Sequence, residues 1–362
     1  MIDLMSDNKI YYSDCRYFKG YIPCKPHKEY GYHCETCPEY SKVSKKILII
    51  KLGAIGDVIR TTPLLERLWK DEPEAEIWWL TYSPDIVPKR VDKVLGFTLE
   101  NIITIRNINF DLIINLDKDY QACALASEIR SDDTWGYILK DGRPVSANKN
   151  AEYKFLTGLF DDVSKVNTKN YMEEIFEICG WEFAGEEYIL DVDSSIKWDI
   201  PNSSKKIIGL NTGCGARWVS RLWDNKYWIE LIKMLQAGGW FPMLLGGKQE
   251  HENNTYLQKQ TGAYYPGHFS LREFISLTNQ CDGIVSAVTM GMHISIGLKK
   301  PLILMNNIFN PNEFELYGRG EIIQPEKECK CYFSPRCHNE EYFCMDYLKP
   351  ESIYEAIKRH VK

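Results

Sequence analysis

The sequence lacks an apolar run that could cross a bilayer, since none of its hydrophobic stretches reaches the roughly 18 residues that a spanning helix needs. It also lacks the surplus of positive charge typical of nucleic-acid binding, because the formal net charge is −6. Its first residues, MIDLMSDNKIYYSDC, do not show the basic-then-apolar order of a signal peptide. We therefore expect a cytoplasmic protein with no transmembrane segment and no nucleic-acid partner.

Two runs of alternating strand and helix patterns follow a segment without periodicity. Residues 1–45 predict a small Cys-rich extension, and residues 46–193 carry the strand-like runs KILIIKL, AEIWWLTY, NIITI and FDLIINLD. After a polar linker at 194–204, the alternation restarts over 205–349 with KKIIGLNTG, FPMLLGG, CDGIVSA and PLILMNN. Residues 350–362 predict an amphipathic helix. At roughly 150 residues per domain, this order predicts an α/β protein with two doubly wound, Rossmann-like domains and a ligand between them.

The first strand passes to its helix through the turn LGAIGD, which ends in Asp57. Glycines let a ligand approach the backbone, and the unpaired N–H groups at a helix start favour negative charge. An ionised carboxylate at this place can accept a proton from an incoming hydroxyl, although a helix-start carboxylate without chemistry is the simpler interpretation. A dinucleotide cofactor is not favoured, because the first acid after AEIWWLTY is Asp85, beyond the strand end.

Several stretches, in order, resemble glycosyltransferase family 9, the ADP-heptose heptosyltransferases. They are ILIIKLGAIGDVIRTTPLLERL, then NTGCGARWVSRLWDNKYW from Asn211, then LLGGKQEHE, then VSAVTMGMHISIGLKKP. The resemblance spans most of the chain and implies the GT-B fold, in which the two domains face a central cleft. It also implies an inverting transfer of a sugar, heptose in that family, from a nucleotide-diphosphate donor such as ADP-heptose to a hydroxyl of a glycan or protein.

The resemblance also implies roles for particular residues. Asp57 matches the catalytic base. The positions that match donor-binding residues are Thr212, Gly213, Arg221, Glu250, Thr289, Met292 and His293. A guanidinium, an imidazole and the N–H groups of a helix start would stabilise the departing diphosphate, so no catalytic metal is expected.

Two departures keep other functions open. Val288 and Met290 stand where family members commonly have the aspartate and glycine of a DTG motif, which leaves part of the donor site uncertain. The alternatives are a GT-B-like nucleotide-sugar epimerase and a non-catalytic GT-B-like binding or scaffold protein. Arg221, Glu250 and His293 also have simpler interpretations, as a surface arginine, a solvated acid and a core histidine. The sequence leaves the oligomeric state open.

Eight of the twelve cysteines form two clusters, and clustered cysteines without an export signal favour metal over disulfides. Four thiolates suit tetrahedral Zn or Fe, and such a metal would hold loops that lack a core of their own. The rear cluster, within 329–344, resembles the iron-binding cysteine finger of a heptosyltransferase branch that modifies bacterial autotransporters. The alternative at both places is free thiols or disulfides. The candidate ligands are Cys15, Cys24, Cys34 and Cys37 in front and Cys329, Cys331, Cys337 and Cys344 at the rear.

Overall fold

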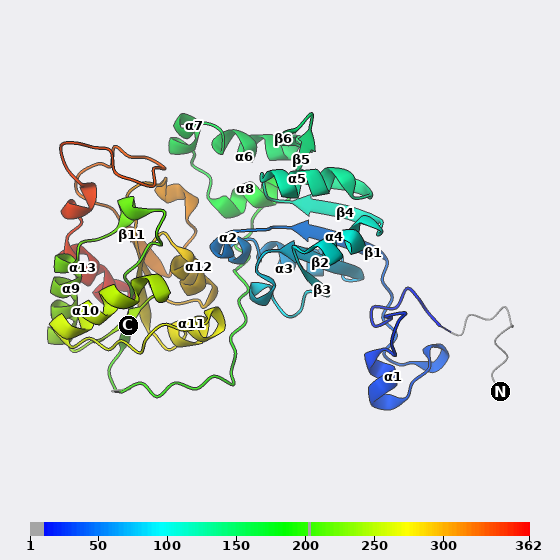
Figure 1. Cartoon of the computed structure of the whole chain (residues 1–362), viewed down its shortest axis with the longest axis horizontal. Coiled ribbons are helices and arrows are strands. Elements are labelled where there is room, and N and C mark those ends of the chain that lie inside the picture. The colour runs from blue at the N-terminus through cyan, green and yellow to red at the C-terminus, as the bar shows by residue number, and fades with distance from the viewer. Residues whose placement is uncertain (1–10, 202–203) are drawn as a thin grey trace.

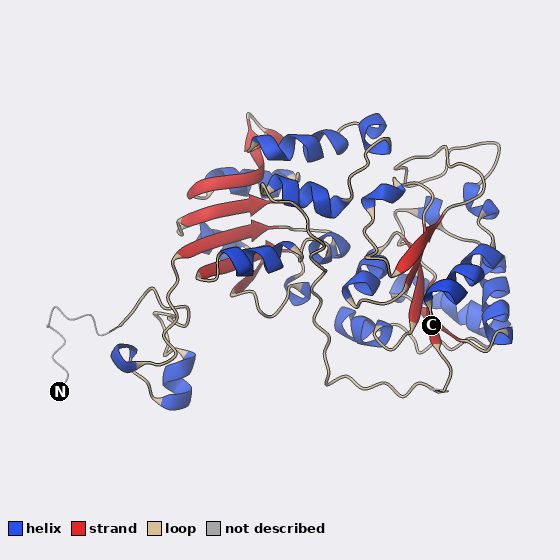
Figure 2. Cartoon of the chain, turned by 180° about the vertical axis from the view of Figure 1, so that it is seen from behind, coloured by secondary structure: helices blue, strands red, loops and turns tan. Residues whose placement is uncertain are grey.

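The computed structural model describes residues 11–201 and 204–362. The predictions made for residues 1–10 of the Cys-rich extension and for 202–203 of the polar linker lie outside the described residues. The rest of the chain forms two α/β domains, each with a central sheet, and a small N-terminal extension that stands apart from both (Figure 1 and Figure 2). No helix within the described ranges is long and apolar enough to cross a membrane.

The first sheet has six strands in the order β3-β2-β1-β4-β5-β6. Strands β1 to β5 are parallel to their neighbours, and β6 runs antiparallel to β5. The strand order reverses beside β1, and ligands of such sheets bind at the carboxyl ends of the strands near that reversal. The strands are β1 (Lys45–Ile50), β2 (Ala75–Thr81), β3 (Lys93–Gly96), β4 (Phe110–Asn115), β5 (Ser131–Lys140) and β6 (Arg143–Ser146).

Helices connect these strands and follow the last of them. Their buried apolar residues join those of the sheet in two continuous clusters, one on each side of β1. The helices of this domain are α2 (Ile55–Ile59), α3 (Leu64–Asp71), α4 (Leu99–Arg106), α5 (Tyr120–Glu128), α6 (Glu152–Thr157), α7 (Asp161–Lys165) and α8 (Tyr171–Ile178).

The stretch DVIRTTPLLERLWKD, whose apolar residues have the spacing of a helix, is divided between α2 and α3. Pro63 has no N–H to donate to the turn before it. The hydroxyls of Thr61 and Thr62 donate to the carbonyls of Asp57 and Ile59, at 2.8 and 2.7 Å, and so compete with helix continuation. As a result, α2 ends at Ile59, two residues after Asp57.

The stretch NIITI, expected to be a strand, lies instead within α4, and that prediction was wrong. The Thr98 side chain caps this helix by accepting a hydrogen bond from the N–H of Asn101 at 3.4 Å. An apolar run of this length does not distinguish a strand from a helix by its period alone, and the cap before it decides the outcome.

The second sheet has five parallel strands in the order β11-β10-β9-β7-β8. Its strands are β7 (Ile207–Asn211), β8 (Phe241–Leu245), β9 (Gly283–Ala287), β10 (Leu302–Met305) and β11 (Gly320–Ile323). Its helices are α9 (Asn225–Ala237), α10 (His251–Thr261), α11 (Leu271–Thr278), α12 (Met290–Gly297) and α13 (Pro350–His360). The expected helix at the end of the chain is therefore present as α13, which packs against α9 and the sheet. Both sheets confirm the expected α/β fold of two doubly wound domains.

The two domains meet where α2 contacts α12 (Figure 1). The contact is close, because a Cβ added to Gly56 would lie 2.5 Å from Cδ2 of His293. The segment between the domains also contacts the second domain, since the indole N–H of Trp198 donates to Oγ of Ser276 at 3.1 Å and its ring packs against Phe269. The expected polar linker thus contains a residue packed against the second domain.

The N-terminal extension contains α1 (Lys25–Tyr30) and stands apart from the body of the first domain (Figure 1). Arg16 attaches it, through an ion pair with Asp92 and a hydrogen bond of 3.0 Å to the carbonyl of Ala75. The extension is therefore held beside the edge of the first sheet where β2 begins.

Candidate active site

Asp57 is the third residue of α2, directly after the carboxyl end of β1. Its Oδ1 lies 2.8 Å from Nη2 of Arg60, and its Oδ2 accepts a long hydrogen bond of 3.2 Å from the N–H of Ala54. The side chain is 32% exposed. Burial alone would raise its pKa, but Arg60, Lys51 and His293 outweigh that effect and lower the pKa to about 2. Asp57 is thus an ionised carboxylate with one oxygen bound and the other only weakly bound.

The charges around Asp57 are paired with one another. Lys51, at the end of β1, forms a buried ion pair with Asp117, whose other oxygen accepts the N–H of Leu52. Burial alone would lower the pKa of Lys51. The electrostatic effects of Tyr171, Asp117 and Asp57, in decreasing order of size, outweigh burial and raise that pKa. This pair fixes the turn that leads into α2.

His293 lies on α12 and faces α2 from the second domain. It is 7% exposed, its ring stacks on that of Tyr188 at 6.1 Å between centroids, and its Nδ1 has no hydrogen-bond partner. Burial, followed by the charge of Arg60, lowers the pKa of His293 to about 3 against the opposing effect of Asp57. His293 is therefore a neutral imidazole at neutral pH, next to the candidate base.

Three of the expected donor-binding residues line one cleft at the carboxyl ends of β7 and β8, with a volume of about 770 Å³. Thr212 donates its hydroxyl to Oδ1 of Asn254 at 2.5 Å. A Cβ added to Gly213 would lie 2.2 Å from Cγ of Glu250, so any other residue there would displace the Glu250 side chain. Glu250 accepts the N–H of Gly247 at 2.9 Å, which holds its side chain over the loop after β8.

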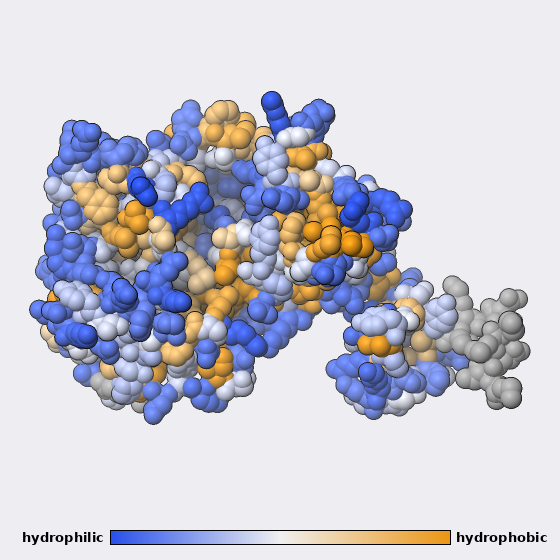
Figure 3. Space-filling view, viewed as in Figure 1, coloured by the Kyte–Doolittle hydropathy of each residue, from blue (hydrophilic) through white to orange (hydrophobic). Residues whose placement is uncertain are grey.

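Other residues that line this cleft come from α9, from α10 and from the segment before α13. The sequence analysis did not identify them: Asp224, Asn225, Gln249, Asn253, Phe343 and Asp346. Asp224, Asn225 and Gln249 lie within the stretches that resemble the family, but no role was assigned to them. For Asn253, Phe343 and Asp346, only the rule that ligands bind beyond the carboxyl ends of parallel strands would have pointed to this part of the domain. Figure 3 shows that the surface between the two lobes is hollowed, with polar and apolar residues on its walls.

Arg221 lies behind the cleft rather than on the surface. It is 7% exposed, its Nη2 donates to the carbonyl of Cys214 at 3.2 Å, and its Nε has no partner. The rings of Trp218 and Phe309 lie 5.4 and 5.5 Å from its guanidinium carbon. Burial lowers the pKa of Arg221 to about 10. A buried guanidinium without a carboxylate is the kind of group that an anionic ligand stabilises.

Thr289 and Met292 lie at the start of α12. The Thr289 hydroxyl oxygen caps the helix by accepting the N–H of Gly291 at 3.1 Å and also accepts the amide of Asn211 at 3.0 Å. Met292 is fully buried, and its N–H donates to the carbonyl of Thr289 at 3.1 Å. The structure thus joins the end of β7 to the start of α12, while the Met292 side chain belongs to the core.

The two cysteine clusters differ in their surroundings. All four front cysteines line one small cavity of about 30 Å³. At the rear, Cys331 Sγ lies 3.6 Å from Cys337 Sγ, and the N–H of His338 and the Asn307 amide point at the sulfurs of Cys331 and Cys344, both at 3.3 Å. Side-chain hydrogen bonding to Cys329 lowers the pKa of Cys344 to about 6. Within the described ranges, no group of three or more His, Cys, Asp or Glu side chains is arranged to hold a metal ion, so the metal expectation is not confirmed.

Comparisons with known proteins agree with this arrangement. The model of glycosyltransferase family 9 (heptosyltransferase) matches residues 159–342. A solved structure described as the glycosyl transferase family 9 from Veillonella parvula has a TM-score of 0.67 at 16% identity and covers 88% of this chain and 97% of its own. The structure of the E. coli ADP-heptose LPS heptosyltransferase II has a TM-score of 0.62 at 16% identity, and the match covers 87% of this chain and 98% of that one.

The iron-containing dodecameric glycosyltransferase TibC from enterotoxigenic E. coli has a TM-score of 0.54 at 13% identity and covers 88% of this chain and 76% of its own. At these identities the structures show the GT-B fold that the sequence predicted. The search of curated proteins gave no match.

Proposed function

The chain belongs to glycosyltransferase family 9, and from this premise we propose that it transfers heptose from ADP-heptose to a hydroxyl of a glycan or a protein, with inversion. The observation that carries the proposal is the contact between α2 and α12. That contact puts Asp57, an ionised carboxylate, near His293 and the start of the helix expected to meet the donor diphosphate.

In the proposed step, the carboxylate of Asp57 accepts the proton of the acceptor hydroxyl as the oxygen attacks the anomeric carbon. A new carbon–oxygen bond forms while the bond from that carbon to the donor phosphate breaks, and ADP leaves with the electron pair. Arg221, the neutral His293 and the N–H groups at the start of α12 would stabilise the charge that develops on the leaving group. Thr212, Gly213 and Glu250 would hold the nucleoside in the cleft, and Thr289 would fix the start of α12. We retain Met292 only as a core residue under that helix start.

Release of ADP from ADP-heptose in the presence of a glycan or peptide acceptor tests this function. Asp57→Asn is expected to lower the rate by about 10²–10⁴-fold, the usual contribution of a general base. Asp71→Asn is the matched control, because Asp71 is a carboxylate of the next helix that is paired only with Arg67. Equal rates of ADP release by wild type and Asp57→Asn would refute the role of Asp57, and failure of ADP-heptose to raise the melting temperature would refute the donor.

We also propose that a structural Zn or Fe draws each cysteine cluster together. The support is that Cys15, Cys24, Cys34 and Cys37 share one cavity and that N–H and amide groups point at the rear sulfurs, as they do around metal-bound thiolates. Elemental analysis of the purified protein is expected to find one metal per cluster, with one lost in Cys34→Ser and the other in Cys331→Ser. Metal at background level in the wild type would refute this proposal.

A further inference from the structure

Arg60 connects the two domains through a single guanidinium group. Its Nη2 lies 2.8 Å from Oδ1 of Asp57, and its Nη1 lies 2.9 Å from Oε1 of Glu313 in the second domain. The guanidinium carbon lies 3.5 Å from the centroid of the Tyr171 ring, and only 15% of the Arg60 side chain is exposed. The candidate base therefore shares its cation with a carboxylate from the other side of the interface.

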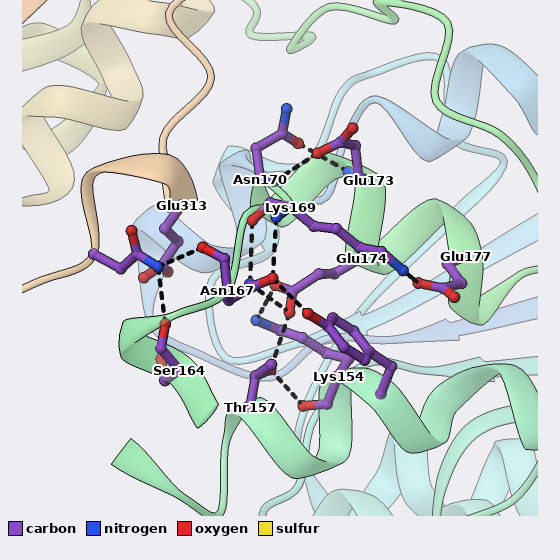
Figure 4. A network of polar contacts seen from close by, with 12 residues as sticks. Lys154, Thr157, Ser164, Asn167, Lys169, Asn170, Glu173, Glu174, Glu177 and Glu313 are labelled. Atoms are coloured by element: carbon purple, nitrogen blue, oxygen red, sulfur yellow. Dashed lines mark hydrogen bonds and ion pairs between the residues drawn. The ribbon is translucent and has the colours of Figure 1, made fainter. Parts of the chain in front are cut away.

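Glu313 reaches Arg60 because the segment that carries it docks on the first domain (Figure 4). The amide of Asn310, which is 6% exposed, donates to the carbonyls of Ser164 and Asn167 at 2.8 and 2.7 Å. The amide of Asn312 donates to the same Asn167 carbonyl at 3.2 Å. These bonds join the segment after β10 to the segment after α7.

A network of hydrogen bonds and one ion pair within the first domain holds the surface on which this segment docks. Oδ1 of Asn167 accepts the hydroxyl of Tyr153 at 2.8 Å, and its amide donates to Oε1 of Glu174 at 3.2 Å. Glu174 is buried and forms an ion pair of 2.5 Å with Lys154 and a hydrogen bond of 2.9 Å with Thr157. Figure 4 shows the side chains of Lys154, Thr157 and Glu174 gathered next to Asn167. A buried network whose members are hydrogen-bonded to one another rigidifies the surface on which the segment that carries Glu313 docks.

The two ion pairs of Arg60 respond differently to any separation of the domains. Asp57 lies in α2 and Arg60 is the C-cap residue of the same helix, so the two move together. Glu313 belongs to the other domain and leaves when its segment leaves. Separation therefore breaks the pair with Glu313 and keeps the pair with Asp57.

We propose that Arg60 is a positioning residue that couples closure of the two domains to the proton affinity of Asp57, because docked Glu313 draws part of the guanidinium charge away from Asp57. This inference rests on the proposed role of Asp57 as the base. With Glu313 absent, the full charge of Arg60 acts on the carboxylate and makes it a weaker base. With Glu313 docked, Arg60 still holds Oδ1 in place and leaves Oδ2 with one hydrogen bond of 3.2 Å.

The other charged and titratable groups around this pair do not depend on docking in the same way. Lys51 acts on Asp57 from the same domain and is itself paired with Asp117. His293 is neutral, and burial raises the pKa of the Tyr188 hydroxyl well above its usual value, so it is neutral as well. Among the cations that lower the pKa of Asp57, Arg60 has the largest effect. A base this acidic accepts a proton poorly, so a partial withdrawal of the Arg60 charge speeds the transfer.

The pH dependence of kcat/KM for ADP release from ADP-heptose tests the coupling. Glu313→Gln removes the competing charge and is expected to move the acidic limb to lower pH by roughly one unit and to lower the rate above that limb. Glu315→Gln is the matched control, because Glu315 lies in the same segment and accepts the amide of Asn170 at 3.2 Å without contacting Arg60. It is expected to leave the acidic limb where it is.

A measurement without turnover gives a second test. Asp57→Asn is expected to lower the folding equilibrium constant at pH 7 roughly tenfold more in the Glu313→Gln background than in the wild type, since a shift of one pKa unit corresponds to a factor of ten. An equal effect in both backgrounds, or an unmoved acidic limb in Glu313→Gln, overturns the coupling. Full transfer by Asp57→Asn instead overturns the proposed function, so the two failures are distinguishable.

Discussion

The charged side chains at the carboxyl edges of the two sheets differ in whether they are paired with a side chain of opposite charge. At the first edge the charges are matched, since Lys51 faces Asp117 and Arg60 faces both Asp57 and Glu313. At the second edge the guanidinium of Arg221 is buried with one carbonyl as its hydrogen-bond acceptor. On α12 of the same domain, Nδ1 of the buried His293 has no partner.

The difference separates groups that are complete from groups that need a ligand. Matched charges at the first edge fix the position of a reactive carboxylate before any substrate arrives. An unmatched, desolvated cation at the second edge is a cost to the folded protein unless an anion binds it. The proposed function assigns the chemistry to the first edge and the binding of a diphosphate to the second, and this difference in pairing supports that assignment.

The largest expected effect comes from removing one member of a buried ion pair at the first edge, and it is a loss of stability. Lys51→Met leaves Asp117 buried with the N–H of Leu52 as its remaining partner. The free energy of unfolding in urea is expected to fall by about 3–5 kcal/mol, as for other buried pairs that lose one member.

Lys45→Met is the matched control for this variant. Lys45 also lies on β1 and pairs with Glu72, but its side chain is 46% exposed. Its loss is expected to cost about 0–1 kcal/mol. If the two variants lose the same stability, burial does not set the strength of the first-edge pairs.

Replacing the unpaired arginine at the second edge is expected to weaken ligand binding rather than to lower stability. Arg221→Met removes a hydrogen-bond donor to the diphosphate and should weaken ADP binding about 10–100-fold, the equivalent of a charged hydrogen bond of about 1.5–3 kcal/mol. Without ligand, its free energy of unfolding should not fall by more than about 1 kcal/mol, because the methionine keeps most of the packing against Trp218 and Phe309.

Calorimetric titration with ADP and thermal unfolding measure these two quantities. Arg272→Met is the control, since Arg272 belongs to the second domain but is 58% exposed and paired with Asp193. Unchanged ADP affinity in Arg221→Met would mean that the second edge does not hold the diphosphate.

The sequence allowed prediction of those features of the two edges that depend on residues close together in the chain. The glycine turn before Asp57 is such a feature, and it stands at a strand-to-helix turn in the structure. Thr289 was singled out only by the family resemblance, and the structure shows that it caps α12. Arg60 carried a usable signal that was missed, because a residue three positions after Asp57 lies on the same helix face. Glu313 carried none, since only the packing of one domain on the other brings a residue so distant in sequence to Arg60. The catalytic and donor-binding roles themselves remain predictions.

The smallest expected effect concerns His293 and the pH dependence of stability. Its pKa in the folded protein, about 3, is below the value of 6.5 for an exposed histidine. Between these values the unfolded chain binds a proton that the folded protein does not, so stability falls as the pH drops below 6.5. From pH 7 to pH 5.5 the loss attributable to His293 is expected to be about 1 kcal/mol. Urea unfolding of wild type and His293→Gln at both pH values measures it as the difference between their pH dependences. If His293→Gln loses as much stability over this range as the wild type, the imidazole is charged in the folded protein, and the second edge then holds a further cation at the interface with the first.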